Sequence, residues 1–210
     1  MKKIVLYFHG KGGNAEEAAH YQSLFPECDV IGVDYTAGTP WEAKEEFPKL
    51  FDALTRGYSS VILIANSIGA CLSMHGLQGK PVEKAYFISP IVDMEKLITD
   101  MMGWANVTEE ELREKKEIPT PFGETLSWAY LTYVREHPVR WEIPTHILYG
   151  SADDLTARET VSAFAAQEGR TLTVLDGGEH WFHTEEQMAF LDNWISQKQR
   201  RNTCLPESDL

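Results

Sequence analysis

Six short apolar segments of strand length recur along this chain, and most of them are separated by stretches with helical periodicity. They lie at residues 4–8, 30–33, 61–65, 85–88, 146–149 and 172–175. Strands that alternate with helices usually pair in parallel, so the pattern predicts an α/β fold with a mainly parallel sheet and helices on both faces. In such a sheet ligands bind beyond the carboxyl ends of the strands.

The length and charge of the chain narrow the possibilities further. Its 210 residues, 43% of them hydrophobic, are enough for one α/β domain with a full core. We expect this domain to span residues 1–198 and the tail at 199–210 to be disordered. A net charge of −13 argues against a nucleic-acid partner, because binding to phosphates needs a basic surface.

Nothing in the sequence predicts insertion into a membrane or secretion. The start of the chain, at residues 1–8, is too short and too quickly interrupted by polar residues to resemble a signal peptide. No segment approaches the roughly 20 apolar residues that span a bilayer. Three cysteines, Cys28, Cys71 and Cys204, are too few and too irregular for a disulfide framework or a metal site. We therefore expect a cytoplasmic protein.

The third apolar segment ends in a short motif, Ala65-Asn66-Ser67-Ile68-Gly69. Small residues two positions either side of a serine are typical of a nucleophile elbow, a sharp strand-to-helix turn that exposes the serine hydroxyl. Ala65 replaces the usual first glycine but is still small. Ser67 is thus the candidate nucleophile, and the alternative is a plain turn in which Ser67 caps the following helix.

A serine nucleophile needs a base, and the base needs an acid that orients it. Asp153 follows the apolar segment at 146–149, and His180 lies in a glycine-rich loop after the segment at 172–175. The order Ser67, Asp153, His180 is the one expected when each residue follows a strand of an α/β sheet. We predict that these three side chains form a catalytic triad.

Two neighbours are alternative members of this site. Asp154 could replace Asp153, although it could also cap the next helix, and His183 precedes a predicted cap at Thr184. The pair His180 and His183 lacks the spacing of a helical metal-binding motif, so we expect no metal.

Catalysis by serine also requires amide donors for the oxyanion. Ile68 supplies one, because it follows the nucleophile at the start of a helix. The loop at residues 9–13 is glycine-rich and follows the first apolar segment. We expect its Lys11 amide, or in second place that of Gly12, to be the other donor.

The same loop supports a rival interpretation. Residues 10–15 fit the pattern G-x-G-x-x-A, and Asp34 ends the next predicted strand, as in a dinucleotide site. This interpretation leaves Ser67, Asp153 and His180 without a role, so it is the less favoured one.

Residues 93–141 interrupt the alternation of strands and helices. The interval shows no strand-like run but carries many aromatic and methionine residues, and an apolar stripe at Leu126, Ala129, Tyr130, Tyr133 and Val134 predicts a helix. We expect a small helical cap over the carboxyl edge of the sheet, in which most of these side chains form the core of the cap and the others contribute an apolar acyl pocket. The alternative is two ordinary crossover helices with long loops.

Capping boxes predict where several helices begin. The pairs are Asn14 with Glu17, Thr108 with Glu111, Thr156 with Glu159, and Thr184 with Gln187.

Together the segments His9-Gly10, 65–69, 150–153 and 178–180 resemble the α/β-hydrolase superfamily, specifically its compact serine esterases, up to about residue 198. The resemblance implies a serine hydrolase that forms an acyl-enzyme without a cofactor and carries a cap before the strand that leads to Asp153. The expected substrates are small carboxylic esters or thioesters. The superfamily also contains proteins that bind without turnover, so a non-catalytic ligand-binding protein is the alternative.

Overall fold

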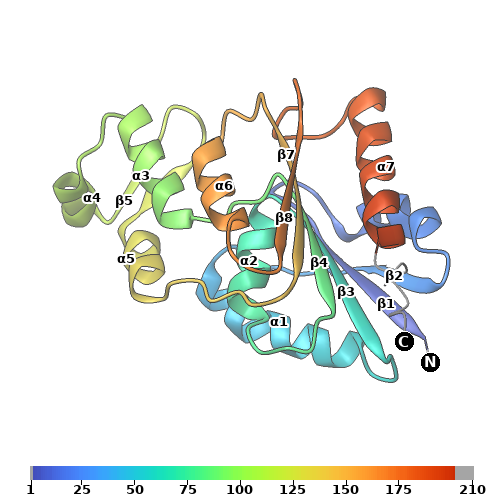
Figure 1. Ribbon diagram of the computed structural model, residues 1–210. Helices are drawn as coiled ribbons and strands as arrows, with labels where there is room; N and C mark the ends of the chain where they lie inside the picture. The colour runs from blue at the N-terminus through green and yellow to red at the C-terminus, as the bar shows by residue number, and fades with distance from the viewer. Residues whose placement is uncertain (1, 202–210) are drawn as a thin grey trace.

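The computed structural model describes residues 2–201 of the chain, and these residues form an α/β structure (Figure 1). The strands are β1 (Lys3–Phe8), β2 (Cys28–Gly32), β3 (Ser60–Asn66), β4 (Lys84–Ile88), β5 (Glu117–Pro119), β6 (Thr125–Ser127), β7 (Thr145–Gly150) and β8 (Arg170–Leu175). The helices are the 3₁₀-helix η1 (Ala15–Leu24) and the α-helices α1 (Pro40–Leu54), α2 (Ile68–Gly76), α3 (Met94–Trp104), α4 (Glu109–Lys115), α5 (Trp128–Glu136), α6 (Arg158–Ala165) and α7 (Glu185–Arg201).

The main sheet of the described residues has six strands in the order β2-β1-β3-β4-β7-β8. Every neighbouring pair in it is parallel. All six predicted apolar segments are strands of this sheet, which confirms the expected fold class. The carboxyl ends of β1, β3, β7 and β8 therefore meet at one edge, where the sequence predicts the site.

Two apolar layers cover the faces of the sheet, and β1 divides its side chains between them. Leu6 packs in a cluster with residues of α1, α2 and α6, whereas Val5 packs in a second cluster with residues of η1 and α7. The side chains of a strand alternate between faces, so one apolar strand supplies both layers. Figure 1 shows η1 and α7 on one side of the sheet, opposite α1 and α2.

Residues 94–136, between β4 and β7, form α3, α4, α5 and the small antiparallel sheet β5-β6. Most of a third apolar cluster comes from these residues, among them Leu97, Leu112 and Leu131, and Cys71 of α2 also belongs to it. We call this segment the insertion. In Figure 1 its helices lie to one side of the sheet.

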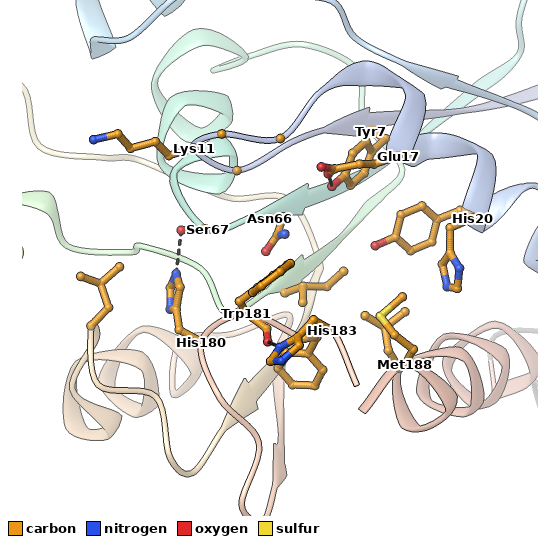
Figure 2. Close-up of a pocket in the computed structure, with 18 residues that line it drawn as sticks. Tyr7, Lys11, Glu17, His20, Asn66, Ser67, His180, Trp181, His183 and Met188 are labelled. Atoms are coloured by element: carbon orange, nitrogen blue, oxygen red, sulfur yellow. Dashed lines mark hydrogen bonds between the residues drawn. The ribbon is translucent and has the colours of Figure 1, made fainter. Parts of the chain in front are cut away.

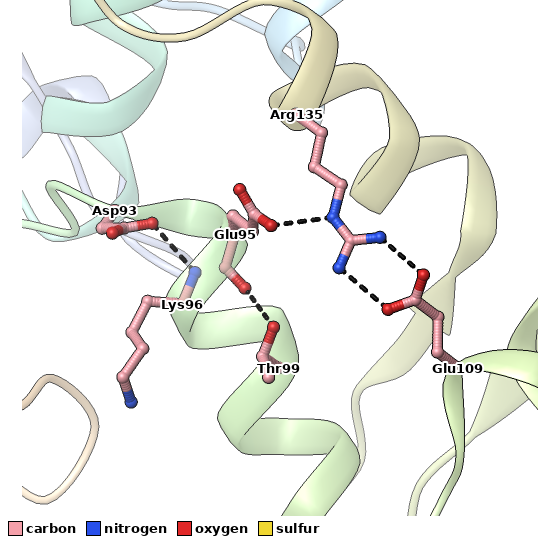
Figure 3. A network of polar contacts seen from close by, with 6 residues as sticks. All are labelled: Asp93, Glu95, Lys96, Thr99, Glu109 and Arg135. Carbon is pink, nitrogen blue, oxygen red and sulfur yellow. Dashed lines mark hydrogen bonds and ion pairs between the residues drawn. The ribbon is translucent and has the colours of Figure 1, made fainter.

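A polar network also joins the three helices of the insertion (Figure 3). The guanidinium group of Arg135 on α5 lies 2.7 Å from a carboxylate oxygen of Glu95 on α3 and 2.7 Å from one of Glu109 on α4. Asp93 caps the start of α3, where its carboxylate accepts a hydrogen bond from the Lys96 amide at 2.9 Å. The helices are thus fixed to each other at their polar surface as well as in their core.

Two details of the insertion differ from the prediction. Strands β5 and β6 lie where no strand is expected, because segments of three residues are too short to show an alternating pattern. Leu126 belongs to β6 rather than to the helix, and the buried residues of α5 are Leu131 and Val134. Ala129 is exposed.

The predicted helix caps are mostly present. Asn14 and Glu17 form the expected capping box of η1, although this helix is of the 3₁₀ type, and Thr108 caps α4. Thr184 accepts a hydrogen bond from the Gln187 amide at 3.2 Å. The predicted cap at Thr156 is wrong: α6 begins after Ala157, and no side chain caps it.

The prediction of a disordered tail from residue 199 is wrong at its start. Residues 199–201 continue α7, and the Gln199 amide group donates a hydrogen bond to the Leu24 carbonyl at 3.0 Å. This contact ties the end of α7 to η1. The rest of the predicted tail, residues 202–210, lies outside the described residues.

Among residues 2–201, no helix combines the length and the apolar character needed to cross a membrane.

Candidate active site

Ser67 occupies the turn between β3 and α2 in a strained backbone conformation. Its φ of 50° and ψ of −118° lie in a region that L-residues rarely adopt. The turn is close to the first strand, since a Cβ atom at Gly69 would lie 2.4 Å from the His9 carbonyl oxygen. Only glycine fits at position 69, which explains the second small residue of the motif.

The Ser67 hydroxyl does not cap α2, although Ser67 stands at the N-cap position. Its Oγ lies 2.8 Å from Nε2 of His180, in the loop between β8 and α7. The helix-cap alternative therefore does not account for this serine, whose hydroxyl is directed to an imidazole.

The other ring nitrogen of His180 contacts a buried carboxylate. Nδ1 of His180 lies 2.7 Å from Oδ2 of Asp153, whose side chain is fully buried. The amides of Leu155 and Thr156 donate to Oδ1 at 2.9 and 3.0 Å, and the Thr156 hydroxyl donates to Oδ2 at 3.0 Å. This carboxylate is held by four donors.

These contacts affect the ionisation of Asp153. Burial by itself raises the pKa of the carboxyl group, but the hydrogen bond and charge of His180, with the amides of Thr156 and Leu155, outweigh burial. The pKa of Asp153 is therefore below its ordinary value, and the group is an anion at neutral pH.

The two alternative residues do not make equivalent contacts. Asp154 is exposed, and it does not cap α6. His183 directs Nδ1 to the Trp181 carbonyl oxygen at 2.7 Å, and its ring stacks on that of Trp181. The structure brings Ser67, His180 and Asp153 together and leaves Asp154 and His183 outside their chain of hydrogen bonds.

The loop after β1 passes beside Ser67. A Cβ atom at Gly10 would lie 3.4 Å from Cβ of Ser67, and Gly12 has a φ of 77°, which suits glycine. Neither the Lys11 amide nor the Ile68 amide donates to a backbone or side-chain acceptor within residues 2–201. Both amides are thus free to donate to a substrate oxygen.

Two cavities have Ser67 in their lining. The first has a volume of about 800 Å³ and lies between the loops after β1 and β2 and the insertion. Most of its lining side chains are apolar, among them Ile91, Leu97, Ile98 and Met101. We call it the apolar cavity.

The second cavity, of about 750 Å³, reaches from Ser67 and His180 towards η1 (Figure 2). Its lining combines the aromatic residues Tyr7, Tyr21 and Trp181 with polar side chains that include Glu17 and Asn66. We call it the mixed cavity. No group of three or more His, Cys, Asp or Glu side chains that could hold a metal ion occurs in residues 2–201.

No protein-family model matches this chain, and no curated protein matches its sequence. Solved structures do match. Mouse α/β hydrolase domain-containing protein 10 is 15% identical with a TM-score of 0.75, and the match covers 95% of this chain and 90% of that one. Est1E from Butyrivibrio proteoclasticus, solved with ferulic acid bound, is 14% identical with a TM-score of 0.76, covering 96% and 89%. The chain has the α/β-hydrolase fold.

A third structure of this fold is a lipase-esterase related protein from Clostridium acetobutylicum ATCC 824. It is 17% identical, with a TM-score of 0.63, and the match covers 93% of each chain. At these identities the likeness concerns the fold, so the chemistry has to be argued from the side chains described above.

Sequence reasoning missed one side chain of the site in this α/β-hydrolase fold. Thr156 was expected to cap α6, but its hydroxyl and amide both bind Asp153. The signal was present, because an aspartate often accepts hydrogen bonds from amides two and three residues later in a turn. The polar residues of the mixed cavity were also missed, since β1, η1 and β3 contribute them from separate parts of the chain.

The rival dinucleotide interpretation fits this geometry poorly. A pyrophosphate would have to lie against the loop at residues 10–13 and the start of η1. The Glu17 carboxylate already lies there, since a Cβ atom at Gly13 would be 2.6 Å from Glu17 Oε1. A carboxylate at that point repels a phosphate anion.

Proposed function

We propose that this protein is a serine hydrolase that cleaves small carboxylic esters or thioesters through an acyl-enzyme. The observation that carries the proposal is the continuous chain of hydrogen bonds from Ser67 through His180 to Asp153. A strained serine turn, a base within 2.8 Å and a buried acid are what nucleophilic catalysis by serine requires.

In the proposed first step Nε2 of His180 takes the proton of the Ser67 hydroxyl, and Oγ attacks the carbonyl carbon of the ester. The Asp153 carboxylate accepts a hydrogen bond from Nδ1 of His180, so it fixes the tautomer in which Nε2 is the base. The amides of Ile68 and Lys11 stabilise the oxyanion.

In the second step His180 gives the proton to the leaving oxygen, and the alcohol departs. His180 then deprotonates a water molecule, whose oxygen attacks the acyl carbon, and the proton returns from His180 to Oγ of Ser67 as the carboxylic acid departs. The acyl group occupies the apolar cavity, because the insertion lines that cavity with aliphatic side chains. This assignment favours esters of apolar acids.

A non-catalytic ligand-binding protein with this fold is the alternative. The strain at Ser67 argues against it, because a strained residue persists where function selects it, and a binding pocket has no need of an exposed hydroxyl directed to an imidazole.

A serine-directed fluorophosphonate probe tests the proposal, together with hydrolysis of nitrophenyl esters of increasing acyl length. The wild-type protein should be labelled and should turn over the esters, whereas Ser67→Ala should lose labelling and at least about 10⁴-fold in kcat. Saturable ligand binding without labelling would favour the alternative. Saturable NAD binding without esterase activity would favour the dinucleotide interpretation.

A further inference from the structure

The mixed cavity and the apolar cavity differ in their relation to the base. His180 lines the mixed cavity but not the apolar one, although Ser67 lines both. In ester hydrolysis the base must reach the leaving oxygen in order to protonate it. The mixed cavity is therefore the side on which the leaving alcohol lies, an inference that rests on the proposed function.

The far end of the mixed cavity carries a carboxylate. The Tyr7 hydroxyl donates a hydrogen bond to Glu17 Oε2 at 2.6 Å, and Figure 2 shows this pair beyond Asn66 as seen from Ser67 and His180. Burial, with the neighbouring Tyr21 and Glu17, raises the pKa of the Tyr7 hydroxyl, so Tyr7 remains a donor. The carboxylate of Glu17 keeps further lone pairs for a ligand.

No cation within residues 2–201 forms an ion pair with Glu17. Lys11 lines the cavity, but its ammonium group lies 2.6 Å from Glu124, and Figure 2 shows the side chain directed away from Glu17. The negative charge at this end of the cavity therefore has no basic partner in the described part of the protein.

Two histidines that line the cavity have acidic partners of their own. His20 lies 2.7 Å from Asp192, and Nδ1 of His183 lies 3.5 Å from Glu179. Neither pair adds a net positive charge near Glu17, even when the histidine is protonated.

Aromatic rings surround the same space. The rings of Tyr7 and Tyr21 lie 5.2 Å apart, and Trp181, 68% exposed, stands at the cavity beside His180. Aromatic faces attract cations, and they also favour apolar contact with the methylene or methyl groups around a charge. The net charge of −13 over the whole chain attracts cations from a distance.

We propose that the mixed cavity binds a leaving alcohol that carries an ammonium group, with Glu17 as the residue that recognises the positive charge. The apolar cavity then takes the acyl chain, and Ser67 attacks the carbonyl carbon between them. The released products are an apolar carboxylic acid and an amino alcohol.

Matched pairs of esters test this assignment in the full-length protein. One ester of each pair ends in a trimethylammonio group, and the other ends in a tert-butyl group, in which a carbon atom replaces the nitrogen. The two esters have the same shape but differ by one charge. Spacers of two and four carbon atoms vary the distance between the ester oxygen and the charge, and the acyl group is kept constant. We expect kcat/KM of the wild-type protein to be roughly fivefold or more higher for the charged ester of at least one pair.

Glu17→Gln should bring this ratio close to one. Glutamine keeps one oxygen that accepts a hydrogen bond from the Asn14 amide, so the capping box of η1 is retained, and its NH2 group can donate to the Tyr7 hydroxyl oxygen. Glu16→Gln is the matched control, because Glu16 is exposed like Glu17 but does not line the cavity. Its ratio should equal that of the wild-type protein.

Three results would overturn the proposal while leaving ester hydrolysis in place. These are a ratio near one for both spacers, a ratio that Glu17→Gln does not change, and a glycerol ester preferred over every charged ester. If no ester is hydrolysed at all, the proposed function fails. Titration calorimetry then still tests whether the mixed cavity binds a cation. Binding of trimethylammonioethanol that Glu17→Gln weakens at least fivefold would support the cation site, and equal or no binding would overturn it.

Discussion

The ammonium group of Lys11 lies 2.6 Å from a carboxylate oxygen of Glu124, so an ion pair joins the loop after β1 to the turn between β5 and β6. Both residues line the apolar cavity. Because both side chains are exposed, the pair should contribute less than about 1 kcal/mol to the free energy of unfolding. Its effect should instead be on the alignment of the two cavity walls.

We therefore expect Glu124→Gln to leave the melting temperature nearly unchanged and to raise KM severalfold more for a long acyl ester than for an acetate. Lys11→Met should act on the same interaction, so the double variant should be no worse than the worse single one. Additive effects on KM would show that the two residues act separately.

The choice between the two neighbouring aspartates can be measured directly. Asp153→Asn should lower kcat by about 10⁴-fold, because an amide cannot hold His180 in the required tautomer. Asp154→Asn should change kcat less than twofold, since Asp154 is exposed and outside the hydrogen-bond chain. The opposite result would assign the acid to Asp154.

Thr156 should act on catalysis through Asp153. Removing its hydroxyl by Thr156→Val leaves Oδ2 of Asp153 with one donor fewer, and a hydrogen bond to a charged group contributes about 1.5–3 kcal/mol. We expect a tenfold or greater loss of kcat and a shift in its acid limb, with both restored by Thr156→Ser. Equal activity of the Thr156→Val and Thr156→Ser variants would show that the hydroxyl does not contribute to catalysis.

Parts of this site could be predicted because of how a parallel sheet is built. Ser67, Asp153 and His180 each follow an apolar strand, and the carboxyl ends of parallel strands meet at one edge, so their order and approximate neighbourhood follow from the sequence. Their catalytic roles stay predictions. The ends of strands were harder to predict: β2 begins at Cys28 and β8 at Arg170, both half-exposed edge strands whose first residues are polar or weakly apolar.

Other features leave no periodic pattern in the sequence, because they depend on short local turns or on contacts between distant residues. The hairpin β5-β6 is too short to show a pattern, and Thr156 binds Asp153 instead of capping α6. The sequence also gives no measure of how far the insertion stands from Ser67, so the two cavities could not be predicted. Glu17 illustrates the point, since its capping box was expected but its position in a cavity was not.

The stability of the protein should fall as the pH decreases from about 6.5 towards 4. Burial, with the charges of Lys44 and His137, lowers the pKa of His75 from 6.5 to about 4. The unfolded chain therefore binds a proton at this histidine in a range of pH where the folded protein does not, which favours unfolding. His146, whose pKa burial also lowers to about 4, acts in the same direction.

Urea unfolding at pH 7.5 and pH 5 measures this effect. His75→Gln should remove roughly 1–2 kcal/mol of the pH-dependent loss in the free energy of unfolding, because one of the two histidines with a lowered pKa no longer titrates. An unchanged pH dependence in this variant would mean that His75 is protonated equally in both states.

Two glycines should respond in opposite ways to replacement by alanine. A Cβ atom at Gly69 would lie 2.4 Å from a backbone oxygen, so Gly69→Ala should destabilise the fold by about 2 kcal/mol or more and distort the turn that holds Ser67. Gly103 lies in α3 with nothing within 4 Å of the new Cβ atom, so Gly103→Ala should stabilise by up to about 1 kcal/mol. Chemical denaturation of both variants provides the comparison.

Most of the insertion's apolar cluster is distinct from the two layers that cover the sheet, and it meets one of them at α2, where Cys71 belongs to the cluster and Ile68 packs against both the cluster and that layer. Substitutions that reshape the wall of the apolar cavity can therefore be compensated among α3, α4 and α5, without repacking the strands beneath Ser67. Sites that share no contacts change stability additively. Acyl-chain selectivity can thus be altered by evolution or by design without disturbing the sheet, provided that the contacts of Ile68 and Cys71 at the start of α2 are kept, because these two residues connect the insertion to the turn that holds Ser67.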